Sequence, residues 1–252
     1  MKEEKVFFKN SKGEKIAGIF VSPDVKNPPL VVIVHGFGGY TFEELFSKIA
    51  YPLVDEGFAI FSFMFPGYGP SEGKFSDITV ENEVETLKDV YNFVKTLDID
   101  KERIGSISQS LGCYATLLSK LPFKCNVLIS PATDLKTAFT REFGGYGILE
   151  ELEKGNDVKL DWGRIIYSKF WENVKNHGFF QDFDKVQQPT FVIYGDKDWA
   201  TTLPEIKKIY NLLPEPKKLE ILEGAEHVFL TEDKYAKRVV PLINDWFNRW
   251  LK

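Results

Sequence analysis

Runs of β-branched and other apolar residues alternate along the chain with segments whose apolar positions repeat at helical spacing. Residues 30–34, 58–63 and 190–194 are almost continuously apolar, which is typical of strands buried on both faces of a sheet. Residues 79–97 place their apolar side chains on one stripe, which predicts a long amphipathic helix. Strands and helices in this alternation predict an α/β fold, with a mostly parallel central sheet and helices on both faces.

The remaining elements extend this pattern toward both ends of the chain. Residues 6–9 and 15–21 are expected to form an antiparallel hairpin across a turn at 10–13. The other expected strands are 126–130, 218–222 and a short strand beginning at Ile104. The other expected helices are 42–56, one ending near Leu121, 204–212 and 235–251.

The alternation breaks between residues 135 and 188, a segment rich in glycine and aromatic residues and without a buried strand pattern. So short a piece would bury too little surface to fold alone. We therefore expect residues 135–188 to form an inserted, largely helical cap over the C-terminal edge of the sheet. Residues 1–134 and 189–252 form the predicted core.

Composition restricts the class of protein. The 252 residues carry a net charge of −5, and no run of Lys or Arg stands out, which argues against nucleic acid as a partner. No apolar segment has the length of a membrane span or the pattern of a signal peptide. The two cysteines, Cys113 and Cys125, are too few for a disulfide framework. The expected protein is cytoplasmic, with reduced, buried thiols.

Ser110 lies where a predicted strand turns sharply into a helix. Small residues stand two positions before it, at Ser108, and two after it, at Gly112. This is the pattern of a nucleophile elbow, G-x-S-x-G, with Ser108 in place of the first glycine. The flanking residues must be small because the strand and the helix pass close beside the serine.

A serine hydroxyl needs a base to remove its proton, and the sequence holds only three histidines. His227 follows a predicted strand, as Ser110 does, so both should lie at the same edge of a parallel sheet. His35 also follows a strand, but its glycine-rich surroundings favour a bracing role for it. His177 lies in the cap, where a surface position is expected.

Two aspartates compete to orient the histidine. Asp198 is far enough along its loop to reach the imidazole, whereas Asp196 is expected to hold its own turn through an Asx-type bond. The developing oxyanion needs backbone donors. The N–H of Leu111 at the helix start is one candidate, and the N–H of Phe37, in a glycine-rich turn after the strand at 30–34, is the second.

Five segments together resemble the α/β-hydrolase superfamily over nearly the whole chain. They are HGFGG (35–39), PGYGPSEG (66–73), SQSLG (108–112), GDKD (195–198) and GAEH (224–227). The order Ser, Asp, His is also that of the superfamily. The resemblance implies a triad of Ser110, Asp198 and His227 with an oxyanion hole at Phe37 and Leu111. Within the superfamily the chain is most similar to small feruloyl or cinnamoyl esterases, which carry a short cap after the sixth core strand.

The function predicted from these features is a serine esterase that forms an acyl-enzyme on apolar or aromatic acyl esters. Monoacylglycerol lipase-like and aminopeptidase- or amidase-like activity stay open, the latter because a cap rich in glutamate could hold a substrate amine. A non-catalytic binding protein is a third alternative. No cofactor or metal is expected. The expected partner is a small-molecule ester, without nucleic acid or membrane, and a homodimer is the assembly left open.

Overall fold

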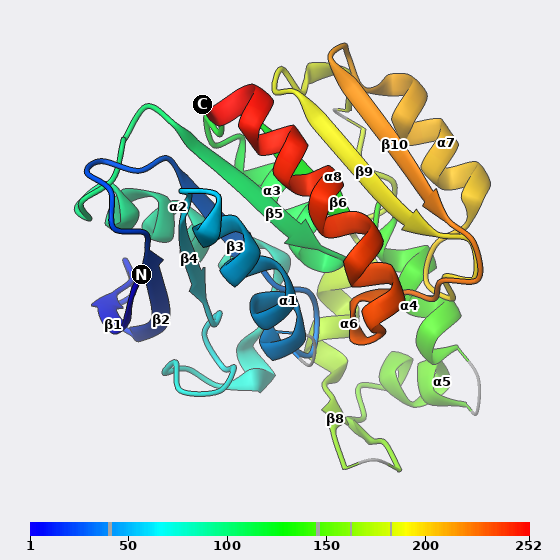
Figure 1. The fold of residues 1–252 in the computed structure, drawn as a ribbon. Helices are drawn as coiled ribbons and strands as arrows, with labels where there is room; N and C mark the ends of the chain where they lie inside the picture. Colours follow the sequence, from blue (N-terminus) through cyan, green and yellow to red (C-terminus); the bar gives the residue numbers. More distant parts are fainter. Residues whose placement is uncertain (40–41, 145–146, 162, 182) are drawn as a thin grey trace.

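A mostly parallel sheet, covered by helices on both faces, forms the centre of the computed structural model (Figure 1). The structure describes residues 1–39, 42–144, 147–161, 163–181 and 183–252, and for residues 42–46 it describes the backbone alone. The eight strands, in their spatial order, are β1 (Lys2–Lys9), β2 (Lys15–Ser22), β4 (Ala59–Phe63), β3 (Leu30–Val34), β5 (Ile104–Gln109), β6 (Asn126–Ile129), β9 (Thr190–Gly195) and β10 (Lys217–Leu222).

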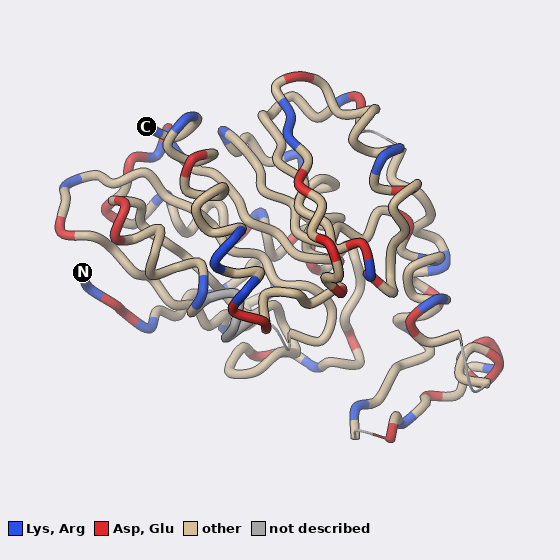
Figure 2. Tube along the Cα trace, turned by 45° about the vertical axis from the view of Figure 1, so that its right-hand side comes forward, with Lys and Arg blue, Asp and Glu red and all other residues tan. Residues whose placement is uncertain are grey.

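The direction of the strands follows the predicted plan. β1 pairs antiparallel with β2 and β2 antiparallel with β4, and every pairing from β4 to β10 is parallel. The expected N-terminal hairpin and mostly parallel sheet are therefore confirmed. The inner strands β3, β4, β5, β6 and β9 carry no charged residue, whereas charges of both signs follow the helices, loops and outer strands (Figure 2). Strands with apolar contacts on both faces cannot hold an unpaired charge without a large desolvation cost.

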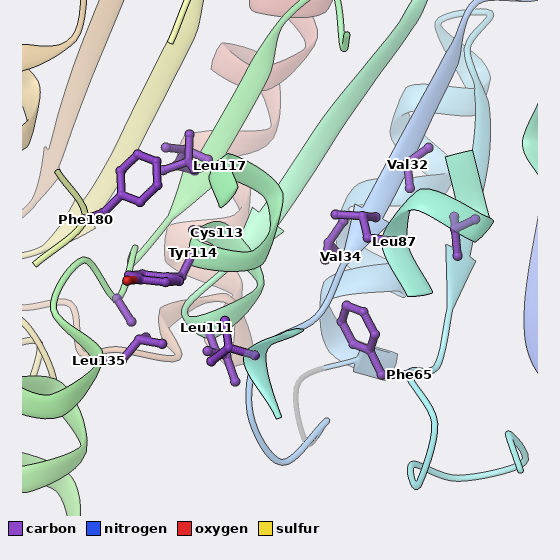
Figure 3. Close-up of a cluster of buried hydrophobic side chains, with 14 of the residues drawn as sticks. Val32, Val34, Phe65, Leu87, Leu111, Cys113, Tyr114, Leu117, Leu135 and Phe180 are labelled. Carbon is purple, nitrogen blue, oxygen red and sulfur yellow. The ribbon is translucent and has the colours of Figure 1, made fainter. Parts of the chain in front are cut away.

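Two hydrophobic clusters cover the two faces of the sheet. One contains Ile49 and Leu53 of α1 (Phe42–Asp55) together with Ile243 and Phe247 of α8 (Asp233–Leu251). The other takes in α2 (Val80–Val94), α3 (Leu111–Ser119) and α7 (Leu203–Leu212). Figure 3 shows part of this second cluster. Side chains of α3 lie with Leu135 and Phe180, and Val32, Val34, Phe65 and Leu87 form the neighbouring part.

The segment between β6 and β9 leaves the sheet and lies beyond the C-terminal ends of the parallel strands (Figure 1). We call residues 135–188 the cap, and its boundaries stay a prediction. It contains α4 (Leu135–Phe143), α5 (Ile148–Glu153), β7 (Val158–Lys159), β8 (Ile165–Ile166), α6 (Ser168–Val174) and the 3-10 helix η2 (Phe183–Lys185). The expectation of no buried strand is wrong in one detail, because β7 and β8 pair antiparallel and Ile166 of β8 is fully buried. Strands of two residues are too short for a sequence period to reveal them.

Several polar contacts join the cap to the core, and three of them involve Arg141, Asn173 and Arg164. Arg141 of α4 forms a two-pronged ion pair with Glu205 of α7, at 2.8 and 2.9 Å. Asn173 of α6 accepts a hydrogen bond from the N–H of Val80, the first residue of α2, at 2.9 Å. Arg164, between β7 and β8, donates to the carbonyl oxygen of Gly38 at 2.7 Å.

Glu83 places a carboxyl on the largely apolar buried face of α2. Its side chain is 3% exposed, and neither carboxyl oxygen has a hydrogen-bond partner. Loss of hydration disfavours the charged form, so burial raises the pKa of Glu83 to about 8. The carboxyl is therefore protonated at neutral pH in the folded protein.

The buried carboxyl of Glu83 should make stability fall with pH. In the unfolded chain it ionises near 4.5 and in the folded protein near 8, so between these values the unfolded state binds fewer protons. The contribution of Glu83 to the free energy of unfolding therefore decreases as pH rises from about 4.5 to about 8. Glu83→Gln removes this dependence. Urea unfolding at pH 5 and pH 8 should show the variant gaining at least about 1.4 kcal/mol relative to the wild type, the equivalent of one pKa unit.

The matched control for this comparison is Glu85→Gln, which changes an exposed carboxylate on the same helix. Its stability should follow that of the wild type at both pH values. Parallel pH curves for Glu83→Gln and the wild type would show that Glu83 does not stay protonated in the folded state.

Candidate active site

Ser110 occupies a strained corner between β5 and α3. Its backbone has φ 50° and ψ −120°, a conformation that costs a non-glycine residue about 1–3 kcal/mol. The surrounding structure holds it there, because the N–H of Ser110 donates to the carbonyl of Ile129 at 3.0 Å and its own carbonyl accepts from the N–H of Cys113 at 3.0 Å. The predicted sharp turn is therefore present at the expected residue.

The glycines around the corner are required by close backbone contacts. A Cβ on Gly112 would lie 2.5 Å from the carbonyl oxygen of His35, and one on Gly36 would lie 2.9 Å from the Cβ of Ser110. Real Cβ atoms do not approach so closely. The glycine-rich turn after β3 consequently packs directly against the serine.

Ser108 takes the place of the first elbow glycine without a clash of this kind. Its hydroxyl lies 2.7 Å from the hydroxyl of Thr116 on α3, and both side chains are buried. The pair satisfies two polar groups that would otherwise lack a partner between strand and helix.

Ser110, His227 and Asp198 form one chain of hydrogen bonds. The Oγ of Ser110 lies 2.9 Å from Nε2 of His227, and Nδ1 of His227 lies 2.8 Å from Oδ2 of Asp198. The Asp198 side chain is completely buried, and its Oδ1 accepts from the N–H groups of Ala200 and Thr201 at 2.8 and 3.0 Å. An ionised aspartate only accepts hydrogen bonds, so it favours the proton on Nδ1 and leaves Nε2 free to take the serine proton.

The loops after β9 and β10 are joined so that Asp198 and His227 meet. Gly195, at the end of β9, allows this approach, since a Cβ there would lie 2.3 Å from the carbonyl oxygen of Ala225. Asp196 takes part in the junction by accepting from the N–H of Gly224 at 2.7 Å. The expected Asx-type bond of Asp196 within its own turn is thus replaced by a bond between the two loops.

The other two histidines have separate places. His35 is buried, donates from Nδ1 to the carbonyl of Gly36 at 2.8 Å and accepts at Nε2 from the N–H of Phe65 at 3.1 Å. Burial lowers the pKa of His35 to about 4, against the smaller opposing effect of the Gly36 bond, so it stays neutral. His177 keeps a partly exposed position in the cap, and its ring bonds Glu81 of α2 at 2.9 Å.

The two predicted oxyanion donors belong to the start of α3 and to the turn after β3. Leu111 is the first residue of α3, so its N–H has no acceptor within the helix. Within the described residues, no hydrogen bond occupies the N–H of either Leu111 or Phe37. The turn that carries Phe37 touches Ser110. Both N–H groups therefore stay candidates for the oxyanion hole.

Two further residues lie near the histidine: Trp199, which sequence reasoning missed, and Glu142, one of the cap glutamates that it weighed as a group able to hold a substrate amine. The ring of Trp199 is 5.4 Å from that of His227, and 40% of this side chain is exposed. Glu142, at the end of α4, lies within electrostatic range of His227 and Asp198. Trp199 directly follows Asp198 in the chain, which is the signal that could have identified it.

A cavity of about 440 Å³ opens between α4, α5 and the β7–β8 hairpin. It is lined by the apolar residues Phe143, Ile148, Val158 and Leu160 and by the charged residues Glu142, Lys159 and Asp161. The ring of Phe143 is 6.3 Å from that of Phe37, so the cavity adjoins the glycine-rich turn. Its size falls within the range of small-molecule sites.

Apart from the few residues left undescribed, His, Cys, Asp and Glu do not gather in any group of three or more able to hold a metal ion. In the same part of the chain, no helix combines the length and the apolar character needed to cross a bilayer.

Residues 44–252 match the model of the prolyl oligopeptidase family. An uncharacterized 31.7 kDa protein from the traX-finO intergenic region of Escherichia coli is 25% identical, over 94% of this chain and 97% of its own length. The uncharacterized protein YfhR of Escherichia coli O157:H7 is 21% identical, over 92% of this chain and 76% of its own length.

Solved structures resemble the whole molecule. Est1E from Butyrivibrio proteoclasticus, with ferulic acid bound, superimposes with a TM-score of 0.83 at 21% identity, covering 97% of this chain and 98% of that one. The Pyrococcus furiosus esterase Pf2001 gives a TM-score of 0.79 at 21% identity, covering 100% and 92%. The predicted α/β-hydrolase fold is confirmed.

The Ser108–Thr116 pair can be tested by a double-mutant cycle. Ser108→Ala and Thr116→Val each leave one buried hydroxyl without its partner, so each should lower the free energy of unfolding by about 1–3 kcal/mol. The double variant removes both hydroxyls and should lose less than the sum of the single losses, by about 1 kcal/mol. Chemical denaturation measures all four proteins. Strictly additive losses would mean that the two hydroxyls do not interact.

Proposed function

The chain belongs to the prolyl oligopeptidase family, and from this premise we propose that it is a serine carboxylic ester hydrolase acting through an acyl-enzyme. The observation that carries the proposal is the hydrogen-bonded chain from Ser110 through His227 to Asp198, at 2.9 and 2.8 Å. Each of these residues follows the C-terminal end of a strand of the sheet. A serine so connected to a base and an orienting carboxylate is equipped for nucleophilic attack.

In the proposed reaction, the Oγ of Ser110 attacks the ester carbonyl while Nε2 of His227 takes the serine proton. Asp198 stabilises the resulting imidazolium, and the N–H groups of Phe37 and Leu111 stabilise the oxyanion. Collapse of the tetrahedral intermediate breaks the C–O bond, and His227 protonates the departing alcohol. Water then attacks the acyl-enzyme with His227 as base, which releases the acid and restores Ser110. These steps use only residues of this chain, the substrate and water.

Apolar or aromatic acyl esters are the proposed substrates. The cavity beside Phe37 has an apolar lining at Phe143, Ile148, Val158 and Leu160. Aromatic rings also surround the turn, because Phe37 stacks on Phe170 of α6 at 4.6 Å and 10°. The similar Butyrivibrio protein is solved with ferulic acid, an aromatic acid. These features together favour an ester of the feruloyl or cinnamoyl type.

Two observations favour a second candidate, hydrolysis of amide bonds. The family is named for an oligopeptidase, and Glu142 lies within electrostatic range of His227, where its carboxylate could hold a substrate amine. Two other glutamates of the cap, Glu151 and Glu153, bond to neighbours within the cap. Glu151 bonds Lys154, and Glu153 accepts from the indole N–H of Trp171 at 2.8 Å.

The proposed setting is a cytoplasm with a small-molecule ester as partner. Its support is the pair of buried cysteines, Cys113 and Cys125, which carry no disulfide. Burial raises the pKa of both thiols, which keeps them protonated and unreactive.

Replacing the nucleophile tests the proposal most simply. Ser110→Ala should lower kcat/KM for p-nitrophenyl esters by at least about 10³-fold, because no other group can form the acyl-enzyme. A fluorophosphonate probe should label the wild type and not the variant. Circular dichroism provides the control that the fold is intact. Wild-type turnover by Ser110→Ala would refute the assignment, and a wild type that neither hydrolyses nor labels would leave a binding protein.

Ester and amide hydrolysis are separated by matched substrates. We expect kcat/KM for an aromatic acyl p-nitrophenyl ester to exceed that for an aminoacyl p-nitroanilide by at least about 10²-fold. We expect this difference because aminoacyl substrates depend on a group that holds their amine, and under the ester proposal Glu142 does not serve as that group. Glu142→Gln should change the anilide rate no more than Glu150→Gln, a control at an exposed residue of α5. A selective loss of anilide hydrolysis in Glu142→Gln would favour the amidase.

A further inference from the structure

The turn that carries the Phe37 N–H is built largely from glycine, so contacts with other residues must fix its conformation. Gly38 and Gly39 have φ values of 88° and 63°, which side-chain-bearing residues rarely adopt. Glycine permits this turn, but it also permits many others, so the sequence of the turn alone does not fix the direction of the N–H. The contacts around the turn must supply that direction.

Two peptide planes connect the turn to the cap through hydrogen bonds. Nη1 of Arg164 donates to the carbonyl oxygen of Gly38 at 2.7 Å. The same peptide unit carries the N–H of Gly39, which donates to the carbonyl oxygen of Gly36 at 3.3 Å. The Gly36 carbonyl belongs to the second peptide unit, which joins Gly36 to Phe37 and carries the N–H of Phe37. Because a peptide is planar, fixing its carbonyl also fixes the N–H on its opposite side.

His35 holds the middle of this connection from the core side. Its Nδ1–H donates to the carbonyl of Gly36 at 2.8 Å, so that oxygen receives two hydrogen bonds. The far end, at Gly38, receives the guanidinium of Arg164. One end of the turn is therefore held by the core and the other by the cap.

Arg164 itself is firmly placed. Its carbonyl accepts from the N–H of Leu160 at 2.7 Å across the β7–β8 hairpin, and its guanidinium carbon lies 5.0 Å from the centre of the Phe75 ring. The side chain is half-buried. A guanidinium over an aromatic face keeps its charge and its N–H donors in a fixed direction.

The ring of Phe37 is held by the same segment. It stacks on Phe170 of α6 and meets Phe139 and Phe143 of α4 edge-on, at centroid distances of 6.5 and 6.3 Å. Both the side chain and the peptide of this residue thus depend on the cap. A cap that only shielded the site from water would need neither contact.

We infer that Arg164 is a positioning residue for the oxyanion hole: through the Gly38–Gly39 and Gly36–Phe37 peptides, the cap sets the direction and strength of the Phe37 N–H donor. The inference rests on the proposed function, since it assigns the donor to an ester oxyanion. The charge matters as well as the geometry. A cation at the start of a chain of hydrogen bonds polarises each peptide in turn and makes the last N–H a stronger donor.

The test compares three variants of the full chain with the wild type. Arg164→Met keeps the aliphatic stem but removes the charge and the donors, and Arg164→Lys keeps the charge. Arg141→Met is the matched control, because Arg141 joins the cap to Glu205 and to the carbonyl of Ala200 without touching the turn. The measurements are kcat and KM for a p-nitrophenyl ester and, by NMR, hydrogen exchange of the Gly39 amide.

We expect Arg164→Met to lower kcat by about tenfold to a hundredfold with KM changed less than threefold, because an oxyanion donor acts in the transition state. Exchange at Gly39 should become at least about fivefold faster. Arg164→Lys should recover part of kcat, and Arg141→Met should change neither kcat nor Gly39 exchange. Wild-type kcat in a folded Arg164→Met, or equal losses in both methionine variants, would overturn the inference.

The exchange measurement separates this inference from the proposed function. Should the wild type hydrolyse no ester and resist the fluorophosphonate probe, the proposed function fails. The exchange arm still reports whether Arg164 holds the turn. Unchanged Gly39 exchange in Arg164→Met would then refute the inference by itself.

Discussion

The close approach of two backbones, at Gly36 and Gly112, is the constraint on which the rest of the site depends. A Cβ at Gly112 would come within 2.5 Å of the His35 carbonyl, and one at Gly36 within 2.9 Å of the Ser110 Cβ. Because neither position carries a Cβ, the turn after β3 and the corner after β5 can pack against each other. This contact places the turn that carries Phe37 beside Ser110 and the start of α3. It also holds Ser110 in a backbone conformation that it would not adopt alone.

A second junction brings the base and its partner to that point. The bond from Gly224 to Asp196 and the contact of Gly195 with Ala225 lock the loops after β9 and β10 together. Asp198 is then buried with both carboxylate oxygens bonded, and His227 bridges from it to Ser110. The parallel sheet makes this meeting possible, because all of these loops leave the same edge. The protein is a serine hydrolase of the α/β-hydrolase fold. The catalytic roles of Ser110, His227 and Asp198 are those proposed above.

Sequence reasoning reached the strands and the candidate residues because both depend on short-range patterns. A run such as Leu30–Val34 suits only a strand buried on both faces, and a polar residue directly after such a run must lie at the sheet edge. The contacts that it did not reach depend on distant partners. Ser108 finds Thr116 on the next helix, Asp196 finds Gly224 on another loop, and Arg164 finds Gly38 across 126 positions of sequence. Hydrophobic periodicity does not indicate these pairs, and the two-residue strands of the cap hairpin are too short to show a period.

The central claim is that Ser110 carries the acyl group of an ester substrate, and the intermediate itself can be observed. The wild-type enzyme is mixed with an excess of an aromatic acyl p-nitrophenyl ester, quenched with acid within the first turnover and digested with trypsin. Mass spectrometry of the peptide from Ile104 to Lys120 should then show the added acyl mass located on Ser110, in an amount equal to the initial burst of p-nitrophenol. Turnover of the ester with this peptide unmodified at every time point, or with the acyl group on another residue, would contradict the account.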